Sequence, residues 1–148
     1  MFKQLDSTRI LPRLAARSKK EVLAELAAAV AGQFPGADAA TITAVLLERE
    51  VMGSTGVGDS IALPHGKIKG LPELILWFGR SMEGISFDSH DGKPAHLFFL
   101  MLAPEAASAA YLKALSQLAR TLKSPQLRAR LMNAVDTDEL AAIFRELS

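Results

Sequence analysis

The sequence predicts an α/β fold with α+β layering, in which helices flank a small mixed β-sheet. Helical patterns fill the first and last thirds of the chain, and short β-branched or aromatic runs bounded by Pro or Gly occupy its middle. Helices that precede, separate and follow strands favour layers of helix packed on sheet. A length of 148 residues is typical of one domain, so a single domain over residues 1–148 is expected.

Two helices are predicted in the first third. Ser18 and Glu21 have the S-x-x-E spacing of a capping box. The apolar residues behind that box share one helical face: Val22, Leu23, Leu26, Ala27 and Val30. The Pro-Gly pair at 35–36 ends this helix, and Asp38 can cap a second helix that runs to about Glu50. The buried side of the second helix is formed by Ile42, Val45, Leu46 and Leu47.

Three short segments predict strands in the middle of the chain. Residues 61–63 are apolar and end at Pro64, while residues 73–79 and 96–103 are longer apolar runs with large or β-branched side chains. An Asp-Gly turn signal lies between the two longer runs, within residues 87–94.

Helical pattern returns in the last third. One apolar stripe is formed by Leu112, Leu115, Leu118, Ala119 and Leu122. Ser124 followed by Pro125 is typical of a helix start, since Pro suits the first turn. Asp136 and Glu139 can cap a final short helix that extends through Phe144.

The composition excludes several classes of function. The chain has no cysteine, which rules out disulfides, thiol nucleophiles and cysteine-based zinc or iron–sulfur sites. Its 17 basic and 16 acidic residues give a net charge of +1, without the basic excess of a dedicated nucleic-acid binder. With three histidines, most histidine-based metal cages are not expected either.

Nothing in the sequence predicts insertion into a membrane. The first ten residues contain no apolar stretch of signal-peptide length and no small-residue cleavage pattern. No apolar run approaches the ~20 residues that a membrane-spanning helix needs. We therefore expect a cytoplasmic protein.

The residues with the most unusual setting lie in the segment 49–69, which is rich in Gly and hydroxyl side chains. Backbone N–H groups in such loops form anion-binding nests, and Ser54, Thr55 and Gly56 are expected to contribute phosphate-binding donors there. Arg49 closes the preceding helix and can offer a forked donor to a phosphate. His65 stands between a Pro and a Gly, where an accessible neutral imidazole can act as a nucleophile or proton shuttle.

Four interpretations of this segment compete. A P-loop has similar Gly and Ser spacing, but Asp59 occupies the position of the phosphate-binding lysine. A serine or metal hydrolase would need a G-x-S-x-G or H-E-x-x-H motif, and neither is present. Phosphoryl capture on His65 uses every unusual residue of the segment. The remaining interpretation is a glycine-rich loop in which His65 only ends a strand.

A resemblance favours phosphoryl capture. The segment LLEREVMGSTGVGDSIALPHGKIKGL, residues 46–71, closely resembles the IIA domains of the fructose/mannitol class of the bacterial phosphoenolpyruvate-dependent phosphotransferase system (PTS). It is most similar to their nitrogen-regulatory branch, IIA-Ntr. The segments 18–27, 87–105 and 112–140 also sit where that family has comparable segments, so the resemblance covers nearly the whole chain.

The resemblance implies a phosphocarrier with a small mixed sheet flanked by helices. His65 corresponds to the histidine that accepts a phosphoryl group on Nε2, while a backbone carbonyl fixes its Nδ1–H. Arg49 corresponds to the arginine that stabilises the phosphate. The donor would be a phosphohistidine on the carrier HPr or its nitrogen-branch paralogue, so neither a cofactor nor a metal is implied.

Two alternatives remain open at this point. The chain could be a sugar-specific IIA component that passes its phosphoryl group to a IIB domain. It could also be a regulator that binds targets differently when phosphorylated and passes the group to nothing. The absence of a fused IIB or IIC domain in this sequence favours the regulatory branch.

Tyr111 marks a departure from the family pattern. Many members carry a second histidine in a segment resembling T-H-L-x-x-L, and Tyr111 takes that position in residues 110–115. A phenol can donate one hydrogen bond to a phosphoryl oxygen but cannot carry a positive charge. Lys67 and Lys69 flank the site, where they either steer an acidic patch of a donor or keep the loop soluble.

Overall fold

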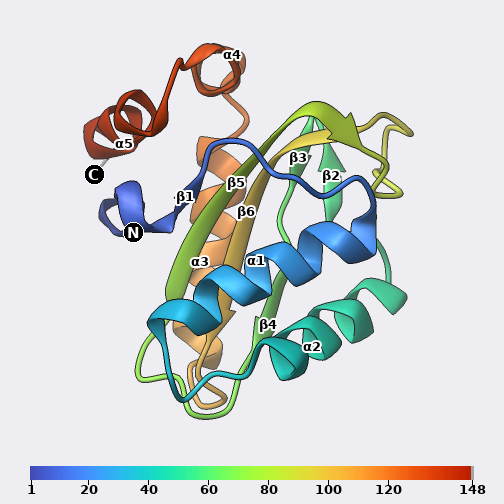
Figure 1. Cartoon of the computed structure of the whole chain (residues 1–148), viewed down its shortest axis with the longest axis vertical. Coiled ribbons are helices and arrows are strands. Elements are labelled where there is room, and N and C mark those ends of the chain that lie inside the picture. The colour runs from blue at the N-terminus through green and yellow to red at the C-terminus, as the bar shows by residue number, and fades with distance from the viewer. Residues whose placement is uncertain (148) are drawn as a thin grey trace.

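The computed structural model describes residues 1–147, which form one mixed six-stranded sheet with helices on both of its faces (Figure 1). The strands are β1 (Ile10–Leu11), β2 (Gly56–Gly58), β3 (Ile61–Ala62), β4 (His65–Lys67), β5 (Ile75–Ile85) and β6 (Ala95–Ala103). The helices are α1 (Lys19–Gln33), α2 (Ala39–Val51), α3 (Ser108–Thr121), α4 (Pro125–Asn133) and α5 (Thr137–Glu146). Two short 3-10 helices, η1 (Phe2–Gln4) and η2 (Ser7–Arg9), precede β1. The predicted α/β fold is confirmed.

The long antiparallel pair β5 and β6 forms the centre of the sheet. β1 lies parallel to β5 on one side, and β3 and β4 lie parallel to β6 on the other. The segment 61–67 therefore runs along β6 in two pieces, with Ile61 opposite Leu97 and His65 opposite Met101. Pro64 separates the pieces and still accepts a hydrogen bond from the Met101 N–H through its carbonyl, at 3.0 Å. His65 is thus the first residue of strand β4.

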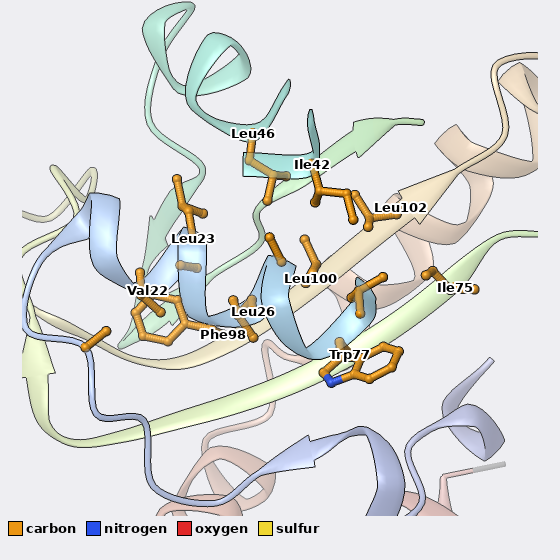
Figure 2. Close-up of a cluster of buried hydrophobic side chains, with 14 of the residues drawn as sticks. Val22, Leu23, Leu26, Ile42, Leu46, Ile75, Trp77, Phe98, Leu100 and Leu102 are labelled. Atoms are coloured by element: carbon orange, nitrogen blue, oxygen red, sulfur yellow. The ribbon is translucent and has the colours of Figure 1, made fainter. Parts of the chain in front are cut away.

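Alternating side chains of β5 and β6 bury two separate hydrophobic layers. On one face, Trp77 and Phe98 pack under α1 and α2, together with the apolar side of α1 that the sequence predicted (Figure 2). On the other face, Phe78 and Phe99 pack against Phe144 of α5 and against α3 and α4. Both faces of the central strands are therefore covered by helices.

The helix starts follow the predicted capping residues. The Ser18 hydroxyl accepts a hydrogen bond from the Glu21 N–H at 3.2 Å, and Asp38 accepts one from Thr41 at 3.0 Å. The Glu21 carboxylate accepts a hydrogen bond from the Arg17 N–H at 2.9 Å. In a standard capping box it would accept from the N–H of the capping residue Ser18, so this box is shifted by one residue. α2 packs against β4.

The predicted apolar stripe of α3 is wrong at its first position. Leu112 is 65% exposed, whereas Tyr111 and Leu115 pack against the hydrophobic layer and Leu118 and Leu122 are buried. The true stripe therefore begins one residue earlier, at Tyr111, with the i, i+4, i+7 spacing of a helical face. Because the buried face of α3 begins at Tyr111, this side chain points toward His65 of β4.

Among residues 1–147, no helix combines the length and apolar character needed to cross a membrane.

Candidate functional site

A backbone carbonyl determines which ring nitrogen of His65 carries the proton. The Nδ1 atom lies 2.7 Å from the carbonyl oxygen of Leu63. A carbonyl oxygen only accepts hydrogen bonds, so Nδ1 must carry the proton and donate. The other ring nitrogen, Nε2, then keeps a free lone pair, which is the tautomer that the family resemblance implies.

The surroundings of His65 also keep its ring uncharged. Burial of the half-buried imidazole lowers its pKa below 6.5, and the nearby positive charge of Arg49 lowers this pKa further. The hydrogen bond to Leu63 and the carboxylate of Glu50 act in the opposite direction but are outweighed. At neutral pH the side chain is therefore a neutral imidazole, the form that can act as a nucleophile.

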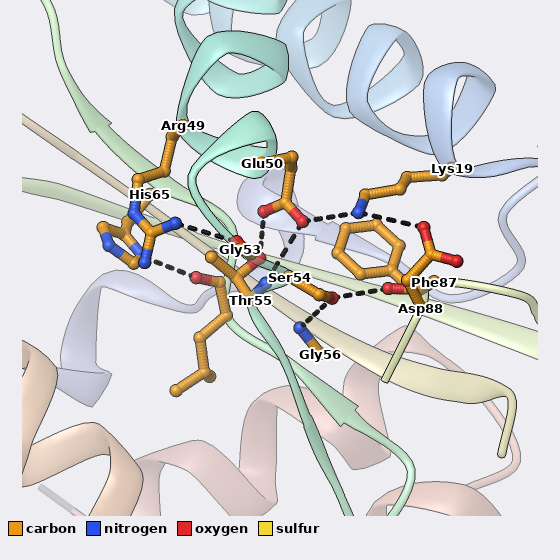
Figure 3. Close-up of polar contacts among 11 residues, drawn as sticks. Lys19, Arg49, Glu50, Gly53, Ser54, Thr55, Gly56, His65, Phe87 and Asp88 are labelled. Atoms are coloured by element: carbon orange, nitrogen blue, oxygen red, sulfur yellow. Dashed lines mark hydrogen bonds and ion pairs between the residues drawn. The ribbon is translucent and has the colours of Figure 1, made fainter. Parts of the chain in front are cut away.

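Arg49 is fixed at the end of α2 by the loop that follows it. Its Nη1 donates to the carbonyl of Gly53 at 2.9 Å (Figure 3). Gly53 has a φ of 135°, a conformation that side chains other than glycine rarely adopt. The bond uses only part of the guanidinium, so the remaining donors are available to an anion.

His65 and Arg49 line two adjoining surface hollows. The first, of about 400 Å³, lies between α2, β4 and α3 and is lined by Val45, Glu48, Arg49, Met52, His65, Gly66, Lys67 and Tyr111. The second, of about 330 Å³, is lined by Arg49, Ser54, Thr55, Val57, Leu63, His65, His90, Leu115, Ser116 and Ala119. Every predicted site residue except Gly56 lines at least one of these two hollows, and His65 and Arg49 line both.

The residues predicted to form an anion nest, Ser54, Thr55 and Gly56, have several of their donors engaged inside the protein. The Ser54 hydroxyl donates to the Phe87 carbonyl at 2.6 Å and accepts from the Gly56 N–H at 2.9 Å. Thr55 is buried, and both its N–H and its hydroxyl donate to the carboxylate of Glu50. These donors are already used inside the protein, because a tight loop satisfies its own polar groups when they are taken from water. The loop shapes the wall of the hollow in this structure.

Glu50 is a site-supporting residue that the sequence analysis missed. Its buried carboxylate accepts from Thr55 and forms an ion pair with Lys19 of α1, at 2.8 Å (Figure 3). The Lys19 ammonium also lies 3.5 Å from the carboxylate of Asp88 and 4.8 Å from the centre of the Phe87 ring. One lysine therefore joins α1, the end of α2 and the loop after β5, and only the arrangement in space could reveal it.

Tyr111 presents its ring to His65. The two ring centres are 5.8 Å apart, with the planes inclined by 61° in an edge arrangement. Burial raises the pKa of the Tyr111 phenol to about 12, although Arg49 acts to lower it. The hydroxyl is therefore a neutral donor at physiological pH.

Within the part of the chain that the structure describes, no group of three or more His, Asp or Glu side chains could hold a metal ion.

Comparison with known proteins identifies the family. The family model described as "Phosphoenolpyruvate-dependent sugar phosphotransferase system, EIIA 2" matches residues 3–147. The chain belongs to this EIIA type-2 family. Its members are components of phosphotransfer relays, and the family resemblance predicted from the segment 46–71 is confirmed.

Relatives of this EIIA type-2 chain come from both regulatory and sugar-transport systems. It is 41% identical over 135 residues to the nitrogen regulatory protein of Bradyrhizobium diazoefficiens, covering 91% of this chain and 88% of that protein. It is 39% identical over 117 residues to the "PTS system fructose-specific EIIA component" of Haloferax volcanii, covering 79% and 75% respectively. The crystal structure of IIA-Ntr from Neisseria meningitidis superposes with a TM-score of 0.89 at 32% identity, over 97% of both chains.

Proposed function

We propose that this EIIA type-2 protein accepts a phosphoryl group on Nε2 of His65 from a phosphohistidine of an HPr-like carrier. The observation that carries the proposal is the hydrogen bond from Nδ1 to Leu63, which leaves Nε2 as the free nucleophile in a hollow that Arg49 also lines. Burial that keeps the imidazole neutral supports the same role.

The proposed transfer balances without a cofactor or an external base. The lone pair of Nε2 forms a new P–N bond, while the P–N bond of the donor breaks and its electron pair returns to the donor imidazole. Each ring keeps one N–H, so no proton has to move during the step. The protein must then supply mainly positioning and neutralisation of the phosphoryl charge, for which Arg49 is suitably placed.

We further propose that the protein acts in nitrogen-type regulation, with the nitrogen-branch carrier as donor. The match to the nitrogen regulatory protein extends over more of this chain than the match to the fructose component, at similar identity. The fructose relative keeps the sugar-specific alternative open, in which a IIB domain receives the phosphoryl group. A regulator that passes the group to no acceptor is the remaining alternative.

The test is a labelling experiment with purified components. The chain is incubated with enzyme I, an HPr-type carrier and ³²P-phosphoenolpyruvate, and in parallel with labelled ATP alone. We expect label only in the complete relay, lost in acid and retained in base as a P–N bond requires. Full labelling of a His65→Ala variant, or an acid-stable label, would contradict the proposal.

A second step separates the regulatory from the transport alternative. The labelled protein is mixed with a fructose-type IIB domain, and transfer of the label is followed over time. We expect the label to remain on His65, whereas rapid and complete transfer to IIB would favour the sugar-specific alternative.

A further inference from the structure

We infer that Lys67 is a second phosphoryl-binding cation, which acts beside Arg49 once His65 is phosphorylated. This inference rests on the proposed function, because it assigns a role in the same site to the residue two positions after His65.

Strand geometry places Lys67 on the side of β4 where His65 lies. Side chains two residues apart in a strand point to the same face, and their Cα atoms are about 7 Å apart. Both side chains line the 400 Å³ hollow. Gly66 between them lies so close to α2 that a Cβ there would be 2.7 Å from Cγ1 of Val45. The register of β4 against β6 holds this arrangement.

Contacts with α3 keep the ammonium of Lys67 near the site. Its Nζ donates to the Ser108 hydroxyl at 2.9 Å and lies 5.6 Å from the centre of the Tyr111 ring. The same ring approaches His65 at 5.8 Å, so one aromatic side chain contacts both the imidazole and the ammonium. The lysine is thereby positioned at the hollow instead of extending freely into solvent.

The charge balance of the hollow calls for a second cation. A phosphoryl group carries a charge of about −1.5 to −2 at neutral pH. The charged side chains that line this hollow are Arg49, Lys67 and the carboxylate of Glu48. Tyr111 stays neutral and adds no charge. A phosphorylated ring that keeps its Nδ1–H carries one positive charge. With this ring and Arg49, the phosphoryl group and the Glu48 carboxylate together still leave about one negative charge. Lys67 is the lining cation that can balance it.

A phosphoryl oxygen is also a better acceptor than the present partner of Lys67. The ammonium is attracted to the negative charge of a phosphoryl oxygen, an attraction that the neutral Ser108 hydroxyl does not offer. We expect Nζ to leave the Ser108 hydroxyl for a phosphoryl oxygen on Nε2 when His65 is modified. Rotation of the long lysine side chain is sufficient for this exchange.

The test compares Lys67→Met with the matched variant Lys69→Met. Lys69 is an exposed lysine that lies two residues after the end of β4. The measured quantity is the equilibrium distribution of ³²P between the HPr-type carrier and the chain. We expect Lys67→Met to shift this distribution toward the carrier by about threefold to tenfold, and Lys67→Arg to restore most of it. Lys69→Met should stay within about twofold of the wild type, as expected for a solvated charge.

A purely structural role would not move this readout, because the distribution reports only the difference between the phosphorylated and unphosphorylated states. Equal distributions for Lys67→Met and Lys69→Met would overturn the inference while leaving the proposed function intact. A wild-type chain that takes up no label would instead contradict the proposed function, and the inference with it. Thermal unfolding of each variant verifies that all of them are folded.

Discussion

The reactivity of His65 depends on which ring nitrogen carries the proton and on whether the ring is charged. The Leu63 carbonyl holds the proton on Nδ1, and burial disfavours the imidazolium. Nε2 therefore presents a lone pair without help from a neighbouring base. This differs from sites in which a second side chain must remove a proton before the nucleophile can react.

The pH dependence of His65 follows from the direction of its pKa shift. Because the folded-state pKa lies below 6.5, the ring charges only as the pH falls below that value. An NMR titration of His65 should therefore give a midpoint below 6.5. Since the unfolded chain binds this proton more readily, His65 contributes stability that is complete above pH 6.5 and is lost as the pH falls through the folded-state pKa. A midpoint at or above 6.5 would show that the ring is not held neutral by its surroundings.

Arg49→Lys tests whether the planar guanidinium matters beyond its charge. Lysine keeps the charge but loses the fork that can hold both Gly53 and a phosphoryl oxygen. We expect phosphoryl uptake to fall by about tenfold per folded molecule, with little change in the free energy of unfolding. Uptake rates and denaturant unfolding are measured on the same preparations, with Arg120→Lys on α3 as the control. If Arg49→Lys unfolds the protein but leaves uptake per folded molecule unchanged, Arg49 is a structural residue.

Tyr111→Phe isolates the phenol hydroxyl, because the ring that contacts His65 is retained. The loss of one neutral donor should slow uptake or shorten the phosphohistidine lifetime by about tenfold or less. Tyr111→His should restore the family arrangement and accelerate onward transfer. Uptake and lifetime are compared for the three proteins side by side, and identical values would exclude any role for this hydroxyl.

At the scale of elements, the site depends on how the end of α2 is tied to its neighbours. Arg49 and Glu50 are adjacent in the last turn but face different partners. Arg49 is held by Gly53 at the hollow, while Glu50 is buried and holds both Thr55 and Lys19. The loop 53–55 is thus fixed from two sides, and with it the position of the guanidinium.

Glu50→Gln should loosen this connection. The substitution removes the charge that Lys19 pairs with and weakens the bonds from Thr55. We expect the free energy of unfolding to fall by about 1–3 kcal/mol, since the group is buried and charge-assisted. Denaturant unfolding is measured beside Glu48→Gln, a matched change at an exposed position of the same helix. Equal stability of the two variants would show that the ion pair contributes nothing to the fold.

The elements differ in how far the sequence could predict them. The starts of α1 and α2 were predictable because capping is a local property of a few residues. β2 and β4 were not, because strands of three residues rich in glycine have no readable periodicity. The stripe of α3 was misassigned because Tyr111 was not counted as apolar, although its ring supplies the first inward contact.

On the scale of the whole molecule, the candidate site lies between residues from the end of α2, from β4 and from the first turn of α3. The two hydrophobic layers fix these elements independently, one through α2 and the other through α3. His65 and Arg49 could be predicted from one continuous motif. The contacts of Lys19 with Glu50 and of Lys67 with Ser108 could not, since they join residues that only the folded chain brings together.

The most direct test of the central claim is the position of the phosphoryl group on the imidazole. The protein is labelled with ¹⁵N-histidine, phosphorylated through the complete relay and studied by NMR, with His65→Ala as the control. We expect the spectra to show a phosphorus–nitrogen coupling to Nε2 of His65. The proton should remain on Nδ1, with its hydrogen bond to Leu63 preserved. Phosphorylation of Nδ1, or of His90 or His96 in place of His65, would contradict the account.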